Sequence, residues 1–158
     1  MAGELLPTPE MVAVAWLKAN VPYLEGLVAT ALPNDSATWK DKGFVVVNVI
    51  GGSTGRNGVR SPALSLMYYG VKTESGKAPW NRTGQMAEQV RDACDPTGKT
   101  YATTRAKYRL TNLGAAYRDA KVLRVNMINE PRRRPDDEGD YAVIVHDIEM
   151  DYVVVPLS

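Results

Sequence analysis

The segment YAVIVHDIEMDYVVV (residues 141–155) alternates apolar and acidic side chains more regularly than any other part of the chain. One face carries Ile144, Ile148, Met150, Tyr152 and Val154, and the other carries Asp147, Glu149 and Asp151. A period of two over this length is typical of a β-strand with one buried and one exposed side. The segment therefore predicts a long strand in a sheet that has one wet face.

Further strands are expected upstream of this segment. Phe44–Ile50 is continuously apolar and rich in valine, which favours a strand covered on both faces. The strand expected at Ala63–Val71 pairs antiparallel with it across Gly51–Gly58, a stretch with four glycines that we expect to be a flexible loop. Leu27–Leu32 is a candidate short strand. In Lys121–Ile128 the alternation places Leu123, Val125 and Met127 on one face.

Two helices are expected. Thr8-Pro9-Glu10 is a typical helix start, with a capping threonine and a proline at the first helical position. The apolar face of this helix is expected to contain Val12, Ala15, Trp16 and Ala19, and the helix ends at Asn20 and Pro22. Pro79-Trp80-Asn81 opens the second helix, with Met86, Val90 and Ala93 on one face.

This order of elements predicts a single α+β domain over residues 1–158. We expect a mixed or antiparallel sheet of about 4–5 strands, with two or more helices packed on one face. Residues 95–116 show no clear period and are interpreted as a long loop or insertion. Pro131–Asp140, which contains a reversal of charge, is interpreted as a turn or loop.

The composition argues against several functional classes. The formal net charge is +1, whereas nucleic-acid binders usually carry a basic excess that neutralises phosphates. The single cysteine excludes an internal disulfide and a multi-cysteine metal site. No apolar run approaches the ~18 residues of a membrane span, and the N-terminus lacks the pattern of a signal peptide. We therefore expect a protein that is intracellular when it is made and has no membrane partner.

The segments that resemble catalytic motifs each lack a required feature. Asp95–Thr100 ends like a phosphate-binding P-loop, but Ala93 occupies the position of its first glycine. Gly51–Gly55 lacks the G-x-G-x-x-G spacing of a dinucleotide-binding turn. His146, the only histidine, is expected to be a hydrogen-bonded core or interface residue, and Cys94 a small packing residue. We expect no enzyme activity and no cofactor.

Two charged groups remain as candidates for contacts. Asp147, Glu149 and Asp151 are spaced roughly 7 Å apart along the strand, too far to chelate one metal ion without curvature. They are interpreted as a solvated face or one that meets a basic partner. Arg132–Arg134 is followed by four acids in six residues, which largely cancel its charge. A self-paired or intersubunit loop is therefore favoured over a nucleic-acid contact.

The order of signals resembles that of the tail terminator (tail completion) proteins of long-tailed bacteriophages. The resemblance covers roughly residues 9–155. It rests on Met11–Lys18, Ala31–Pro33, Phe44–Gly52, Arg60–Leu64, Met86–Ala93, Glu130–Arg133 and Tyr141–Val155. Two features depart from the family pattern: the length of 95–116 and the acidic triplet on the last strand.

The resemblance implies a structural virion protein at the junction of tail and neck, present in the host cytoplasm during assembly. Its members form a hexameric ring on the head-proximal end of the tail tube, stop tube polymerisation and contact a head-completion or neck protein. Genomic DNA passes through the lumen without sequence-specific binding. A near-neutral subunit suits close packing, and one heterologous interface used six times closes a ring.

We expect contacts with the tube or a neighbouring subunit at Gly51, Gly52, Ser53, Thr54, Arg56, Asn57, Arg60, Arg132, Arg133 and Arg134. Asp147, Glu149 and Asp151 are expected to line the lumen or to pair with arginines of a neighbour. A head-closure or connector protein is the structural alternative. A small nucleotide- or phosphate-binding enzyme, or a nucleic-acid-binding factor using Arg132–Arg134 with Lys99, Arg105, Lys107 and Arg109, are alternatives from other classes.

Overall fold

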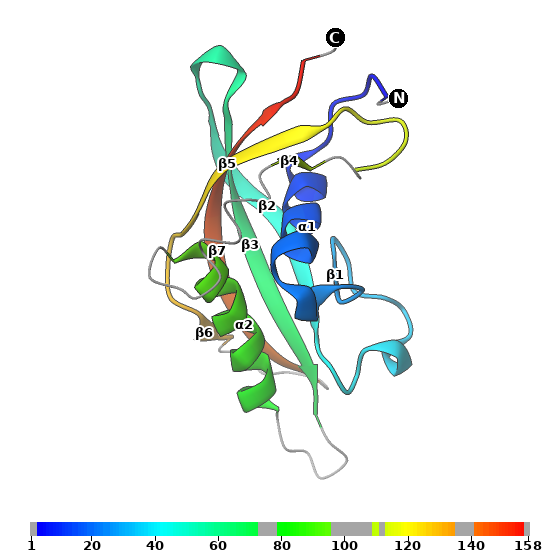
Figure 1. Cartoon of the computed structure of the whole chain (residues 1–158). Coiled ribbons are helices and arrows are strands. Elements are labelled where there is room, and N and C mark those ends of the chain that lie inside the picture. The colour runs from blue at the N-terminus through cyan, green and yellow to red at the C-terminus, as the bar shows by residue number, and fades with distance from the viewer. Residues whose placement is uncertain (1–2, 73–78, 96–108, 111–112, 135–140, 157–158) are drawn as a thin grey trace.

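A computed structural model gives the fold (Figure 1) and describes residues 3–72, 79–95, 109–110, 113–134 and 141–156. Within these residues the α-helices are α1 (Pro9–Asn20) and α2 (Trp80–Cys94). The strands are β1 (Val28–Ala29), β2 (Phe44–Thr54), β3 (Arg60–Val71), β4 (Arg109–Leu110), β5 (Ala120–Met127), β6 (Arg132–Arg133) and β7 (Tyr141–Val154). Short 3₁₀ turns lie at Pro22–Leu24, Ser36–Thr38 and Arg56–Gly58.

The strands form one mixed sheet in the order β1-β2-β3-β7-β5-β4, and β6 pairs with β7 beside β5. β1 and β2 are parallel, and the other described pairs are antiparallel. The α+β class is confirmed. The expected 4–5 strands were too few, because seven strands form the sheet within the described residues. β1, β4 and β6 have two residues each, too short for the alternation that reveals a strand in a sequence.

The predicted glycine loop is wrong over its first half, Gly51–Thr54, whereas the second half forms the turn. β2 runs through Gly51 and Gly52 to Thr54, and β3 begins at Arg60, so the two strands form one long hairpin. The register shifts between Val49 and Gly51, which makes Ile50 the extra residue of a β-bulge. Burial on both faces holds for Phe44–Val47 and ends there, because the rest of β2 extends beyond the core. Likewise, the strand expected at Leu27–Leu32 is limited to Val28–Ala29.

The predicted face of the fifth strand also needs correction. The register between β5 and β7 shifts between Val122 and Arg124, which places Leu123 in a bulge. Val122 and Val125 are buried, whereas Leu123 is 43% exposed. The bulge therefore breaks the alternation that grouped Leu123 with Val125. Upstream, 96–108 and 111–112 of the expected 95–116 loop lie outside the described residues, and Arg109–Leu110 forms β4 instead of loop.

Both expected helices are confirmed. The Thr8 side chain caps α1 by accepting a hydrogen bond from the Met11 N–H at 3.2 Å. The buried face of α1 is rotated from the one expected, because the sheet curls toward the helix from both sides. Ala15 and Ala19 lie on its outer flank. The buried residues are Val12, Ala13, Trp16, Leu17 and Asn20.

The sheet separates a large core from a small one. Both helices contribute to the large cluster, together with the inward face of β3 (Leu64, Leu66 and Tyr68). The other face carries a smaller cluster around Trp39, which stacks on Tyr141 with ring centroids 5.9 Å apart. α1 lies between the edge strands β1 and β4 and contacts both (Figure 1). α1 therefore fills the opening of the curled sheet.

Candidate assembly surfaces

The β2–β3 hairpin carries most of the predicted contact residues and projects from one end of the sheet (Figure 1). Gly51, Gly52, Ser53 and Thr54 are all exposed. Two aliphatic side chains just before them, Val49 and Ile50, are 39% and 56% exposed. The turn is closed by a hydrogen bond from the Gly55 N–H to the Val59 carbonyl (2.7 Å), with Asn57 in the left-handed conformation at φ 61°. The hairpin is thus an arm of two paired strands with exposed apolar side chains.

Arg60, which pairs with Thr54 next to the turn of this arm, is bound within its own chain. Its guanidinium carbon lies 5.5 Å from the centroid of the Tyr152 ring, with which it is paired across β3 and β7. Such a contact of a cation with an aromatic face stabilises the arrangement by about 0.5–1 kcal/mol at a partly exposed site. Arg60 therefore fixes the hairpin to β7 more than it reaches outward.

The loop interpretation of Arg132–Arg134 is wrong, because Arg132 and Arg133 form β6 on the edge of β7. The main chain of β7 offers hydrogen-bonding groups here, and the Arg134 N–H donates to the Val143 carbonyl at 2.9 Å. The Arg133 guanidinium lies 4.4 Å from the centroid of the Trp80 ring. All three arginines are exposed. The acids expected to cancel them, between residues 136 and 140, lie outside the described residues.

The structure separates the two predicted contact regions. Along β7, Arg60 pairs with Tyr152, whereas Arg132 pairs with Val145. Seven residues of extended strand span roughly 23 Å. The hairpin and the arginines of β6 are therefore two surfaces, at different positions along the same strand.

The acidic face of β7 is confirmed as the side away from the main core, and its carboxylates have partners in the same chain. The Arg124 guanidinium lies 2.9 Å from the Asp151 carboxylate and 4.0 Å from that of Glu149. Asn129 donates to the Asp147 carboxylate at 2.9 Å and accepts from the Asp147 N–H at 2.8 Å. The acidic face is thus partly neutralised from β5 and the segment that follows it.

His146 is a buried, hydrogen-bonded core residue, as expected. Its Nε2 lies 2.5 Å from the hydroxyl of Tyr68, and both side chains are fully buried. Burial lowers the pKa of His146 to about 4, with a smaller upward effect of Asp147 and a downward one of Arg132. Burial raises the pKa of Cys94 to about 12, so its thiol stays protonated at neutral pH. Cys94 is therefore a packing residue without the thiolate that nucleophilic chemistry needs.

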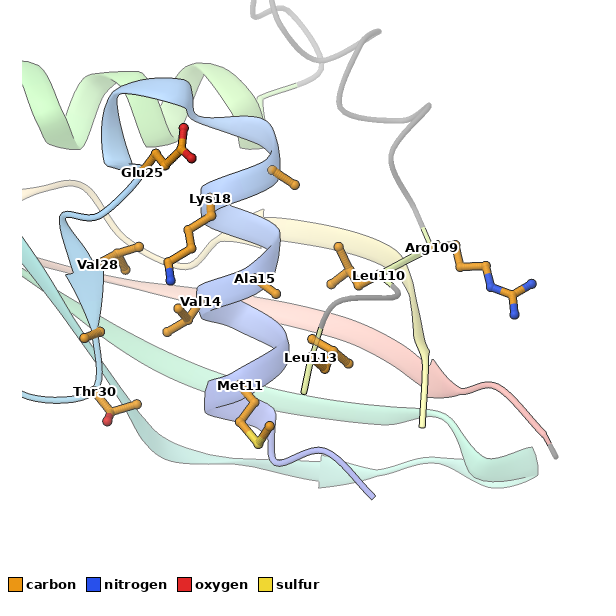
Figure 2. A pocket seen from close by; sticks show the side chains of 12 residues that line it. Met11, Val14, Ala15, Lys18, Glu25, Val28, Thr30, Arg109, Leu110 and Leu113 are labelled. Carbon is orange, nitrogen blue, oxygen red and sulfur yellow. The ribbon is translucent and has the colours of Figure 1, made fainter. Parts of the chain in front are cut away.

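A groove that the sequence did not reveal runs along the outer face of α1 (Figure 2). Its volume is about 670 Å³. It is lined by Met11, Val14, Ala15, Lys18, Ala19, Glu25, Val28, Ala29, Thr30, Arg109, Leu110 and Leu113. One feature of the sequence could have indicated this groove. The segment of α1 is apolar on nearly all sides, which is typical of a helix that is covered all round.

In the part of the chain that the structure describes, no three His, Cys, Asp or Glu side chains gather to hold a metal ion. The P-loop-like segment lies outside that part beyond Asp95, as do Lys99, Arg105 and Lys107. No described helix has the length and apolarity needed to cross a bilayer. No protein-family model matches the chain, and no curated protein matches it significantly.

Proposed function

We propose that this chain is a structural, non-enzymatic subunit of a bacteriophage tail. In this proposal six copies form a ring on the head-proximal end of the tail tube, where the ring ends tube polymerisation and joins the tail to the neck. The order of helices and strands that resembles the tail terminators suggests this class. DNA passes through the lumen of the ring without sequence-specific contacts.

The projecting β2–β3 hairpin is the observation that carries the proposal. The exposed side chains of Val49 and Ile50 in this arm keep apolar surface in contact with water, which is unfavourable until a partner covers it. The segment Gly51–Thr54 of the arm has no charge, which suits burial in an interface. In an assembly, such an arm can contact the tube or a neighbouring subunit. In an isolated enzyme it would have no partner to contact.

Deletion of residues 53–58 tests the proposal. Gly52 and Pro62 lie opposite each other in the hairpin, so residues 59–61 then form a short turn. The pair of Arg60 with Tyr152 is lost, and the pairs of β3 with β7 from Ala63 onward are kept. We expect a folded subunit that no longer caps tails, so that tubes grow beyond their normal length in electron micrographs. A matched control, Gln85→Ala with Gln89→Ala, changes the exposed face of α2 instead. Tubes of normal length in the deletion variant would contradict the proposal.

The alternatives give different outcomes. A head-closure or connector protein would bind the portal side of the neck and leave isolated tube ends uncovered. A nucleotide- or phosphate-binding enzyme would gain thermal stability with nucleotide and Mg²⁺, because a ligand stabilises the state that it binds. A nucleic-acid-binding factor would show an affinity for DNA that falls steeply with salt. The proposed function predicts binding to tube ends and neither of the other two effects.

A further inference from the structure

The outer face of α1 is apolar where a helix of a soluble domain usually carries charge. Met11, Val14, Ala15 and Ala19 are partly exposed there, and Lys18 is the one charged residue among them. β1 borders this face on one side and Leu110 and Leu113 on the other, so that the helix forms the floor of a groove (Figure 2). Because small residues alternate with larger ones along this floor, an extended segment of chain has room to lie against it.

The same chain also exposes an apolar projection. Val49 and Ile50 protrude from β2 at the start of the hairpin arm, and Ile50 is displaced outward from the ladder by the bulge. From Asn48 to Gly55 the arm contains no charged residue. It therefore brings no charge of its own into the groove, whose charged lining residues are Lys18, Glu25 and Arg109.

The arm and the groove of one subunit cannot meet. The pairing of β2 with β3 continues to Thr54 and Arg60, and β3 is held in turn by β7 over most of its length. This ladder directs the arm beyond the end of the sheet, away from the outer face of α1 (Figure 1). A contact between arm and groove therefore requires two copies of the chain.

We propose that the groove along α1 receives the β2–β3 hairpin of a second copy of this chain. The two surfaces of this contact differ, so the interface is heterologous, and its repetition joins copies head to tail. Such a contact closes into a ring when the rotation between neighbours allows it. This inference rests on the proposed ring and identifies the surfaces that build it.

Cross-linking between two differently tagged variants tests the contact. One carries Ile50→Cys and the other Ala15→Cys, both with Cys94→Ala, and a short thiol-to-thiol cross-linker is added at the concentration at which the chain assembles. We expect the mixed product to exceed the product of either variant alone by about tenfold or more. Replacing Ala15→Cys by Gln89→Cys on the exposed face of α2 gives a matched control that should yield little product.

A groove variant supplies a second measurement. Ala15→Glu keeps a good helix former on a partly exposed position, so the subunit should fold, but it places a carboxylate where the arm would lie. We expect the concentration needed for self-association to rise by about tenfold or more, whereas Gln89→Glu leaves it unchanged.

Two outcomes separate this inference from the proposed function. Rings on tube ends without the mixed cross-link, and unaffected by Ala15→Glu, would overturn the arm-in-groove contact and leave the proposed function standing. A mixed cross-link in copies that assemble but never cap tubes would support the contact and overturn the proposed function. Failure of the chain to associate under any condition would overturn both.

Discussion

The side chains of His146 and Tyr68 are joined by a 2.5 Å hydrogen bond in the core between the sheet and the helices. Neither side chain has measurable exposure. Burial raises the pKa of Tyr68 well above its ordinary value, so its hydroxyl keeps its proton and is available to donate to Nε2. The pKa of His146, lowered by burial to about 4, keeps the imidazole neutral at pH 7 in the folded protein. Its other nitrogen, Nδ1, has no partner among the described residues.

This pair predicts a pH-dependent stability. The pKa of His146 is about 4 in the folded chain and near the ordinary 6.5 in the unfolded chain. The unfolded state therefore binds more protons between these values. The contribution of neutral His146 to stability is fully present above pH 6.5. Below that, the free energy of unfolding falls by about 1.4 kcal/mol per pH unit as the pH is lowered toward 4.

His146→Gln should remove this dependence, because glutamine keeps a hydrogen-bonding side chain but does not titrate. Denaturant unfolding at several values between pH 5 and 6.5 measures the slope, in a window where most carboxylates remain ionised. An equal slope in both proteins would mean that another group titrates.

We predict that the hairpin tolerates no side chain at position 52, which is now glycine. Its φ is +120°, and a Cβ atom there would collide with the carbonyl of Ser61 on β3. Gly52→Ala should therefore lower the free energy of unfolding by about 1–3 kcal/mol and weaken tube capping by distorting the arm. Gly58→Ala is the matched control, since its φ of +78° is also positive but the space beside it is open. Equal losses in both variants, by thermal or chemical unfolding, would contradict the steric explanation.

We predict that Asn129 stabilises the connection between β5 and β6 through its two hydrogen bonds to Asp147. Its side chain accepts the Asp147 N–H and donates to the Asp147 carboxylate, next to the main-chain bond from the Ile128 N–H to the Asp147 carbonyl. Asn129→Ala should destabilise the fold by about 1–3 kcal/mol, because the Asp147 N–H then loses its acceptor in a half-buried site. Asn126→Ala, on the same edge, is the control and should stay within about 0.5 kcal/mol. Chemical denaturation of both variants checks the difference.

The acidic face predicts an effect of charge on assembly or DNA passage. Reversal of Asp147, Glu149 and Asp151 to lysine should impair ring formation or infectivity if these residues line the lumen or meet a neighbour's arginines. Such a variant also places positive charges around Arg124, which binds Asp151 and Glu149 in the same chain.

A compensated variant separates the two effects. Arg124→Glu combined with Glu149→Lys and Asp151→Lys inverts the local charges but keeps ion pairs of opposite sign. Its stability by thermal unfolding should stay close to that of the parent chain, so that a remaining defect reports on assembly. Normal tails and normal DNA delivery in both variants would count against the lumen and the neighbour contact alike.

The local pattern of the sequence determined those helices and strands that keep the same side buried along most of their length. β7 alternates between buried and partly exposed residues from Ile144 to Tyr152, because one of its faces packs on the core there. α1 begins at Pro9 because Thr8 supplies a cap and proline tolerates the first turn. Burial of His146 likewise followed from its place on the apolar face of the strand.

Tertiary structure alone decided the features that depend on partners far away in the chain. Leu123 leaves the face of β5 because β5 and β7 change register there, and β6 exists because the main chain of β7 has groups left to pair. The glycine stretch becomes a paired arm because β3 continues opposite it. The outer face of α1 becomes a groove because the sheet curls around the helix and brings Leu110 beside it. Side-chain periodicity records burial on one face, whereas main-chain pairing and curvature leave no such record in the sequence.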